Sequence, residues 1–164
     1  MIHRSNSRLG NNKGFTLLEF VVVIALAAVI MVGVSILITK GKESAAFSDT
    51  NDKLQIIVAG LAERKVFNSA MPLQAAASTT WPAALEPYIP SDLRAAGAFP
   101  HSYQCVAATN QVTIGTPVLQ DNPQATSVLQ RLKDNNTCSA ASTVGATFGI
   151  NCVVKAFDGS ANCQ

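Results

Sequence analysis

The distribution of apolar residues divides the chain into a long N-terminal apolar run and a more mixed remainder. Residues 15–38 form a run of 24 residues in which only Thr16, Glu19 and Ser35 are polar. About 20 apolar residues suffice for a helix to cross a bilayer. We therefore expect residues 15–39 to form a membrane-spanning helix.

The helical pattern continues after this run. Between residues 40 and 70 there is no proline, and apolar residues recur at the spacing of one helical face. These apolar residues are Phe47, Leu54, Ile57, Val58 and Leu61. The charged residues between them, which we expect in solvent, are Glu43, Asp49, Asp52, Lys53, Glu63 and Arg64. Met71-Pro72 is the first strong break, so residues 15–70 are expected to form one helix, roughly 80 Å long at about 1.5 Å per residue.

The next segment, residues 71–100, is rich in Ala, Thr, Ser and Pro and is expected to be a loop. Trp81-Pro82 precedes a possible short helix over residues 83–87. Trp81, Leu85 and Tyr88 are large enough to pack this loop onto the rest of the domain, and we prefer that role for them to ligand binding.

Residues 101–164 show the patterns of a small sheet. Apolar and polar residues alternate in 103–107 and 111–115, on either side of a turn, which predicts a β-hairpin. A short helix is expected over residues 123–134, and a strand over residues 147–157. The whole chain is therefore expected to be α+β, with a long N-terminal helix packed on a small antiparallel sheet.

All four cysteines fall in this last region. They are Cys105, Cys138, Cys152 and Cys163. An even number of cysteines beyond a membrane segment predicts two disulfides in an oxidising compartment, with three possible pairings. Zinc binding is the alternative, but the region has no CxxC motif and only one histidine, His101.

The charge is distributed unevenly along the chain. Arg4, Arg8 and Lys13 lie within residues 1–14, where no acid occurs, while the remainder holds nine Lys/Arg and ten Asp/Glu. The formal net charge of +2 therefore arises from the leader and gives no strong signal for nucleic-acid binding. Because basic residues tend to stay cytoplasmic, we expect the N-terminus inside and the cysteine-containing domain outside the membrane.

Catalytic motifs are missing from the sequence. The two histidines are His3 and His101, and there is no HExxH, no phosphate-binding glycine loop and no GxSxG. A single Asp at Asp158-Gly159 is too little for calcium, so we expect a turn there. We expect no enzyme activity, no cofactor and no metal site.

Glu19 is the unusual residue of the apolar run, because a carboxylate deep in lipid costs roughly 3 kcal/mol. It follows a basic leader, a glycine and an apolar residue. The segment Gly14-Phe15-Thr16-Leu17-Leu18-Glu19 resembles the processing site of type IV prepilins, which include pilus subunits and the pseudopilins of type II secretion. The resemblance implies that a prepilin peptidase cuts between Gly14 and Phe15 and methylates the new N-terminus at Phe15.

The resemblance also implies a life cycle. The processed chain is held in the bacterial inner membrane with its domain in the periplasm, and the pilus assembly machinery then polymerises it through its N-terminal helix into an extracellular homo-oligomeric filament. We hypothesise that Glu19 pairs with a Phe15 ammonium and sets the register between subunits, because a paired charge is far cheaper in low dielectric than a lone one. The alternative is a Glu that merely reaches the lipid headgroups.

The sequence leaves several roles open. A major pilus subunit, a minor or tip pilin with a binding role, and a type II secretion pseudopilin all share this organisation. A signal-anchored periplasmic protein that never polymerises is a further alternative, which retention of residues 1–14 would favour. Adhesion, motility, DNA uptake, conjugation and secretion are the outputs among which the sequence does not choose.

Overall fold

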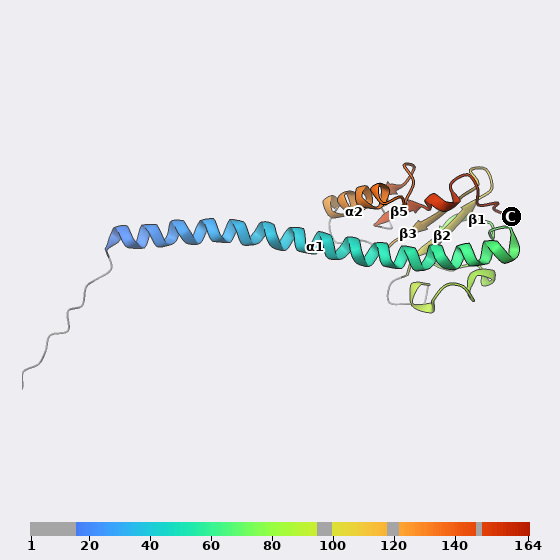
Figure 1. The fold of residues 1–164 in the computed structure, drawn as a ribbon, viewed down its shortest axis with the longest axis horizontal. Helices are drawn as coiled ribbons and strands as arrows, with labels where there is room; N and C mark the ends of the chain where they lie inside the picture. Colours follow the sequence, from blue (N-terminus) through green and yellow to red (C-terminus); the bar gives the residue numbers. More distant parts are fainter. Residues whose placement is uncertain (1–15, 95–99, 118–121, 147–148) are drawn as a thin grey trace, which may run out of the picture. The chain divides into compact units, whose positions relative to one another are not determined.

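The computed structural model describes residues 16–94, 100–117, 122–146 and 149–164. The chain divides into two units, residues 1–40 and residues 41–164 (Figure 1). The predicted cleavage residues Gly14 and Phe15 lie outside the described residues, as do the first 13 residues of the leader.

Helix α1 runs without interruption from Leu17 to Asn68 and contributes to both units. Its end is marked by Ser69, which has a left-handed φ of 46° and donates its amide hydrogen to the carbonyl of Lys65. Such a residue is a common helix terminator. The predicted continuous helix and its break before Met71-Pro72 are confirmed.

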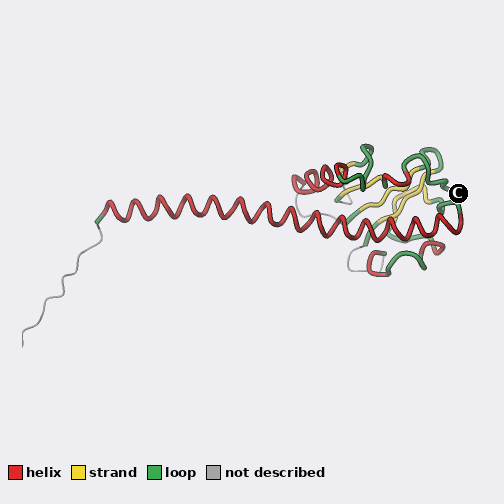
Figure 2. Tube along the Cα trace, in the orientation of Figure 1, coloured by secondary structure: helices red, strands yellow, loops and turns green. Residues whose placement is uncertain are grey.

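The second unit contains a five-stranded antiparallel sheet in the order β1-β2-β3-β5-β4 (Figure 2). The strands are β1 (Gln74–Ser78), β2 (Ser102–Val106), β3 (Gln111–Gly115), β4 (Thr143–Val144) and β5 (Ile150–Val153). The predicted β2–β3 hairpin is confirmed, and Asn110 in its turn has a φ of 54°. The fold is α+β, as predicted.

One face of the sheet forms the core together with the second half of α1. Tyr103, Val112 and Ile114 on the sheet are buried, as are Leu54 and Leu61 on the helix. Side chains alternate between the two faces of a strand. The opposite face therefore carries the polar positions of the same strands.

Helix α2 (Asn122–Asp134) packs on the part of α1 where burial begins. Its Ser127 hydroxyl donates to the Glu43 carboxylate, and the Arg131 guanidinium lies 4.0 Å from the centre of the Phe47 ring. The predicted short helix over residues 123–134 is confirmed. Glu43, which we expected to face solvent, also accepts a hydrogen bond from α2.

The predicted loop contains a strand that sequence reasoning did not assign. β1 has the sequence Gln-Ala-Ala-Ala-Ser, which shows neither β-branched residues nor alternation. It pairs with β2 through its backbone, with Gln74 opposite Cys105. The strand is thus determined by the neighbour that it pairs with and not by its own side chains.

The rest of this segment packs against the domain as predicted. It forms two short 3₁₀ helices, Ala83–Leu85 and Ser91–Leu93. Trp81 is buried, its indole N–H donates to the His101 carbonyl at 2.7 Å, and its ring centre lies 5.3 Å from that of Tyr103. The Trp81 indole therefore fixes the loop to the start of β2.

The predicted strand over residues 147–157 is shorter in the structure. β5 covers Ile150–Val153 and is followed by a 3₁₀ helix, Lys155–Phe157, while residues 147–148 lie outside the described residues. After Val153 the backbone forms hydrogen bonds with the segment around Cys138. There the Lys155 amide donates to the Thr137 carbonyl. The chain then turns and buries Phe157 in the core.

Arg64 was expected in solvent, and this expectation is wrong. Its side chain is half-buried, and its Nε and Nη1 atoms are covered without a hydrogen-bond partner among the described residues.

Burial raises the pKa of the nearby Tyr103 far above its ordinary value, and the charge of Arg64 offsets this only partly. Tyr103 stays protonated and donates to the Pro72 carbonyl at 2.9 Å.

Gly60 of α1 lies directly against the loop backbone at Tyr88. A Cβ atom there would overlap the carbonyl oxygen of Tyr88 and come within 2.9 Å of Ile89 Cδ1. The loop backbone would have to move away, and Trp81, the single tryptophan of the chain, would report the change.

We expect Gly60→Ala to destabilise the domain by about 2 kcal/mol, because overpacking forces backbone shifts. Gly41→Ala is the matched control, since no atom lies within 4 Å of the added Cβ, and it should stabilise the helix by about 0.5–1 kcal/mol. Urea unfolding of the full chain in detergent, followed by Trp81 fluorescence, measures both. Equal stability of the two variants would contradict the packing described here.

Candidate processing and assembly site

The first turn of α1 is capped by Thr16. The Thr16 hydroxyl accepts a hydrogen bond from the Glu19 amide at 3.3 Å, and the Thr16 carbonyl accepts one from the Phe20 amide at 3.1 Å. Thr-x-x-Glu at the start of a helix is the pattern of a capping box. Sequence reasoning missed Thr16 because it treated that residue only as a polar member of the apolar run, although the capping pattern was visible.

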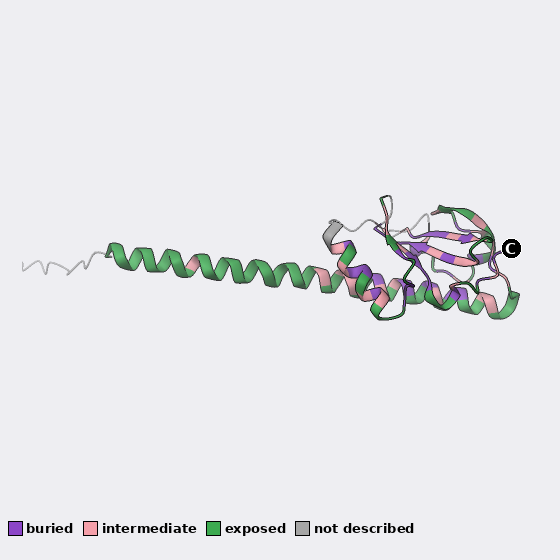
Figure 3. Cartoon of the chain, turned by 90° about the horizontal axis from the view of Figure 1, so that it is seen from above, coloured by how far each residue is buried: buried purple, intermediate pink, exposed green. Residues whose placement is uncertain are grey.

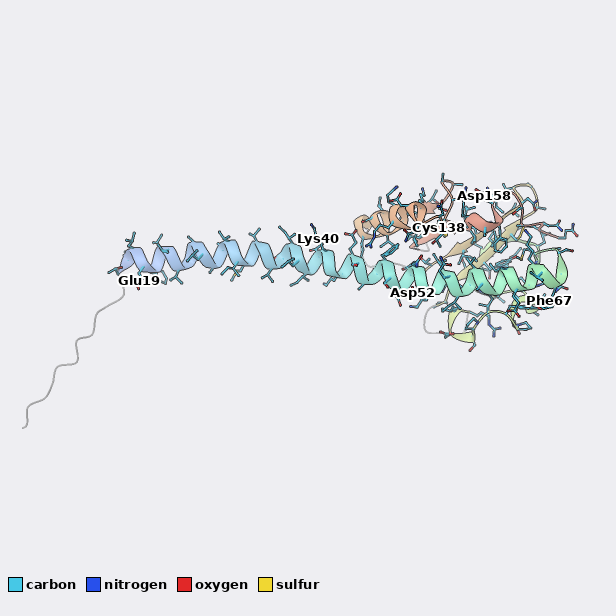
Figure 4. The ribbon with its side chains drawn as sticks, viewed as in Figure 1. Glu19, Lys40, Asp52, Phe67, Cys138 and Asp158 are labelled. Atoms are coloured by element: carbon cyan, nitrogen blue, oxygen red, sulfur yellow. A yellow bond between two sulfur atoms is a disulfide. The ribbon has the colours of Figure 1, made fainter. Side chains whose placement is uncertain are left out.

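The Glu19 side chain lies in the first turn and is exposed (Figure 4). A carboxylate at this position interacts favourably with the positive end of the helix dipole. Within the described part of the chain, no residue forms a side-chain hydrogen bond or ion pair with it. Because Phe15 lies outside that part, the pairing of Glu19 with a Phe15 ammonium stays a prediction.

The helix following Glu19 exposes apolar side chains on all sides (Figure 3). The two polar side chains near its end bond back to the helix itself, with Ser35 donating to the Met31 carbonyl at 2.8 Å and Thr39 to the Ser35 carbonyl at 3.0 Å. These hydroxyls need no water or external partner. By length and composition, α1 is able to cross a membrane.

The exposed apolar side chains are large and numerous. Within the first unit they are Leu17, Leu18, Phe20, Val21, Val22, Val23, Ile24, Leu26, Val29, Ile30, Met31, Val32, Val34, Ile36, Leu37 and Ile38. An apolar surface of this extent is typical of a membrane or protein–protein interaction site.

The structure pairs the four cysteines as Cys105–Cys163 and Cys138–Cys152, one of the three arrangements that the sequence left open. The first bond ties the C-terminal segment to β2, next to an isolated bridge between Met71 and Cys163. The second joins β5 to the segment that follows α2. All four sulfurs are used, so no thiolate remains for the zinc alternative.

The other residues considered for chemistry have structural roles. His101 is buried just before β2, where its backbone amide donates to the Leu93 carbonyl. Asp158 accepts a hydrogen bond from Gln111 Nε2 at 2.5 Å and begins a turn in which Gly159 has a φ of 70°. Among the described residues, no three His, Cys, Asp or Glu side chains lie together as metal ligands would.

Comparison with known proteins adds one finding. The prokaryotic N-terminal methylation motif matches residues 9–35, which include the predicted cleavage site, Glu19 and most of the apolar run. This chain carries a type IV prepilin-like leader. No curated protein and no solved structure gave a match.

The prepilin-like leader supports a pilin-like or pseudopilin protein, and the family with this motif is structural. Together with the apolar part of α1, it fits a precursor anchored in the membrane. The capped first turn places Glu19 at the start of the apolar helix.

We expect the Thr16 cap to determine how firmly the first turn of α1 is held. Thr16→Val keeps the shape of the side chain but removes the hydroxyl acceptor, which should cost about 1 kcal/mol and speed amide exchange at Glu19 about fivefold. Thr16→Ser, which keeps the hydroxyl, is the control. Amide exchange followed by NMR on the full chain in micelles tests this, and equal rates in both variants would refute the cap.

Proposed function

We propose that this protein is a structural subunit of a type IV pilus, stored in the inner membrane after leader cleavage and polymerised through its N-terminal helix. The observation that supports this most directly is the match of the methylation motif to residues 9–35, which include most of an apolar helix surface that no described residue covers. In the membrane, lipid covers this surface, and in a filament the same helices of neighbouring subunits replace the lipid.

The proposal gives Glu19 a partner. Cleavage after Gly14 would create an ammonium group at Phe15, one helical turn before the Glu19 carboxylate. Because the Glu19 carboxylate is exposed and has no partner among the described residues, it is available to the Phe15 ammonium of its own or a neighbouring subunit. In the apolar interior of a filament, a subunit out of register would leave this charge unpaired, at a cost of several kcal/mol.

The domain of residues 41–164 suits a position outside the cytoplasm. It contains two disulfides, which persist in the periplasm and at the cell surface. This agrees with the basic residues of the leader remaining in the cytoplasm. The prepilin peptidase and the pilus assembly machinery are the partners that the leader implies, and the filament itself makes the protein a homo-oligomer.

A pseudopilin of type II secretion is the second candidate, because the same methylation motif supports it equally. The two candidates differ in where the processed protein accumulates. Subunits of a pilus are recovered from the cell surface in quantity, whereas a pseudopilin or a minor subunit remains with the membrane.

We expect the protein sheared from the cell surface to begin at Phe15, with one added methyl group and four hydrogens fewer for its two disulfides. Intact mass and N-terminal fragment spectra of the surface and membrane fractions measure this directly. Gly14→Val is the control and should retain residues 1–14, because prepilin cleavage is expected to require this glycine.

Two other results would change the proposal. If the processed species were found only in membranes, the protein would be a pseudopilin or a minor subunit and not the main subunit of a pilus. A wild-type chain that still begins at residue 1 or 2 would rule out both and leave a signal-anchored periplasmic protein.

We expect Glu19→Ala to be cleaved normally but to form at least about tenfold fewer filaments, because one charge of the proposed pair would be left without its partner. Ser35→Ala is the matched control, since Ser35 is also polar in the apolar run but bonds only to its own helix. Quantification of sheared filaments against total processed protein separates assembly from cleavage. Normal filament yield from Glu19→Ala would exclude the role in register.

A further inference from the structure

The sheet face that points away from α1 contains an open hollow of about 510 Å³. Its lining comes from all five strands of the sheet and from the segment before β4. The lining residues are Ala77, Gln104, Thr113, Ala141, Thr143, Asn151 and Val153. Ligand pockets have volumes of about 300–1,000 Å³, so the hollow has the size of a small-molecule site.

The register of the strands explains how these side chains come together. Gln104 on β2 lies opposite Thr113 on β3, and Thr113 lies opposite Val153 on β5. In the next row, Thr143 on β4 lies opposite Asn151 on β5. Because side chains on one face recur every second residue, these two rows form one continuous floor.

The segment before β4 is fixed at one side of the hollow. The Ser142 hydroxyl accepts a hydrogen bond from the Val153 amide at 2.9 Å, which holds the neighbouring Ala141 and Thr143 in place.

Most polar side chains of the hollow have no hydrogen-bond partner among the described residues. The side chains of Thr113, Thr143 and Asn151 form no hydrogen bond with any described residue, and none of them is fully buried. Gln104 donates to the Ala75 carbonyl at 2.7 Å through Nε2, which orients its side-chain oxygen as an available acceptor. Four strands thus present hydroxyl and amide groups that are free to bind a ligand.

The chemistry of this lining excludes several ligand classes. None of the lining residues carries a charge, so the hollow offers neither the basic groups that bind phosphate or carboxylate nor the carboxylates that bind cations. It has no aromatic or large aliphatic wall for an extensively apolar ligand. An extended peptide would pair with the edge of a sheet and not with its face.

We propose that this hollow binds a neutral, hydroxyl-rich ligand, namely an uncharged glycan. Hydroxyl and amide side chains supply both donors and acceptors, as sugar hydroxyls require. The small apolar surfaces of Ala77, Ala141 and Val153 suit the C–H faces of a sugar ring. The inference rests on the sheet face alone and holds whether the protein is a pilus subunit or a pseudopilin.

The test uses the full processed chain in lauryldimethylamine oxide micelles, because detergents with sugar headgroups would compete for the site. The probes are methyl β-galactoside, maltotriose and the trimer of N-acetylglucosamine. Saturation-transfer NMR detects binding, and amide shift changes locate it. We expect at least one probe to bind saturably, with shifts at Thr113, Thr143 and Asn151, and with little dependence on ionic strength because the ligand is uncharged.

Two variants and one control test the site itself. Thr113→Val keeps a β-branched side chain on the strand but removes the hydroxyl, and should weaken binding about fivefold or more. Asn151→Asp keeps the size of the side chain but removes its donor, and should weaken binding similarly. Thr109→Val, an exposed threonine in the β2–β3 turn outside the hollow, should bind as the wild type does. Unchanged Trp81 fluorescence and intact disulfides show that each variant is folded.

Several results would overturn the proposal. Failure of all three probes to bind saturably would do so, as would shifts that map to another face or equal binding by Thr113→Val and wild type. Binding that weakens steeply as ionic strength rises would also overturn it, because an uncharged ligand is not screened by salt. Loss of filaments in Thr113→Val and Asn151→Asp, without any glycan binding, would show that the hollow is covered by a second copy of this chain.

Discussion

The apolar surface of α1 between Leu17 and Ile38 has to be removed from water, and the rest of the structure depends on how this happens. Nothing in the described part of the chain covers this surface. In lipid, every backbone polar group must also be satisfied within the helix. Thr16 closes the first turn, and Ser35 and Thr39 return their hydroxyls to the helix backbone. Beyond its first turn, the apolar part of the helix is therefore satisfied in its own hydrogen bonding, so under the proposed function it could exchange lipid for neighbouring helices.

The second half of the same helix serves a different purpose, because it forms one wall of the core of the domain. Gly60 allows the loop to approach the helix closely, and Trp81 and Leu85 of that loop are buried in the core. At the end of α1, Lys65 donates to the Ser160 carbonyl at 2.5 Å and lies 5.3 Å from the centre of the Phe157 ring. The C-terminal segment is thus held on the helix as well as on the sheet, and the domain is built directly on the element that would assemble the filament.

Features with a local cause could be predicted from the sequence. The first half of α1 followed from its unbroken apolar run, the second half from helical periodicity, and the β2–β3 hairpin from the pattern around a turn that accepts a left-handed residue at Asn110. Features set by distant partners could not be predicted. β1 exists because β2 offers a backbone to pair with, and β5 ends where the backbone begins to bond to the segment around Cys138. The disulfide pairing depends on which segments the fold brings together. In the candidate site, the leader and Glu19 were recognised from their pattern, whereas the Thr16 cap was overlooked and the hollow on the sheet face arises only from tertiary packing.

The disulfide between Cys105 and Cys163 has a mechanical consequence. It closes a loop with a sequence separation of 58, inside which the Cys138–Cys152 bond closes a second loop of 14. A chain of that length extends to about 200 Å when it is pulled straight, at about 3.4 Å per residue. In a filament under tension, this length stays locked inside each subunit even if the domain loses its fold. Any lengthening of a subunit would then be confined to the residues outside this loop, among them α1.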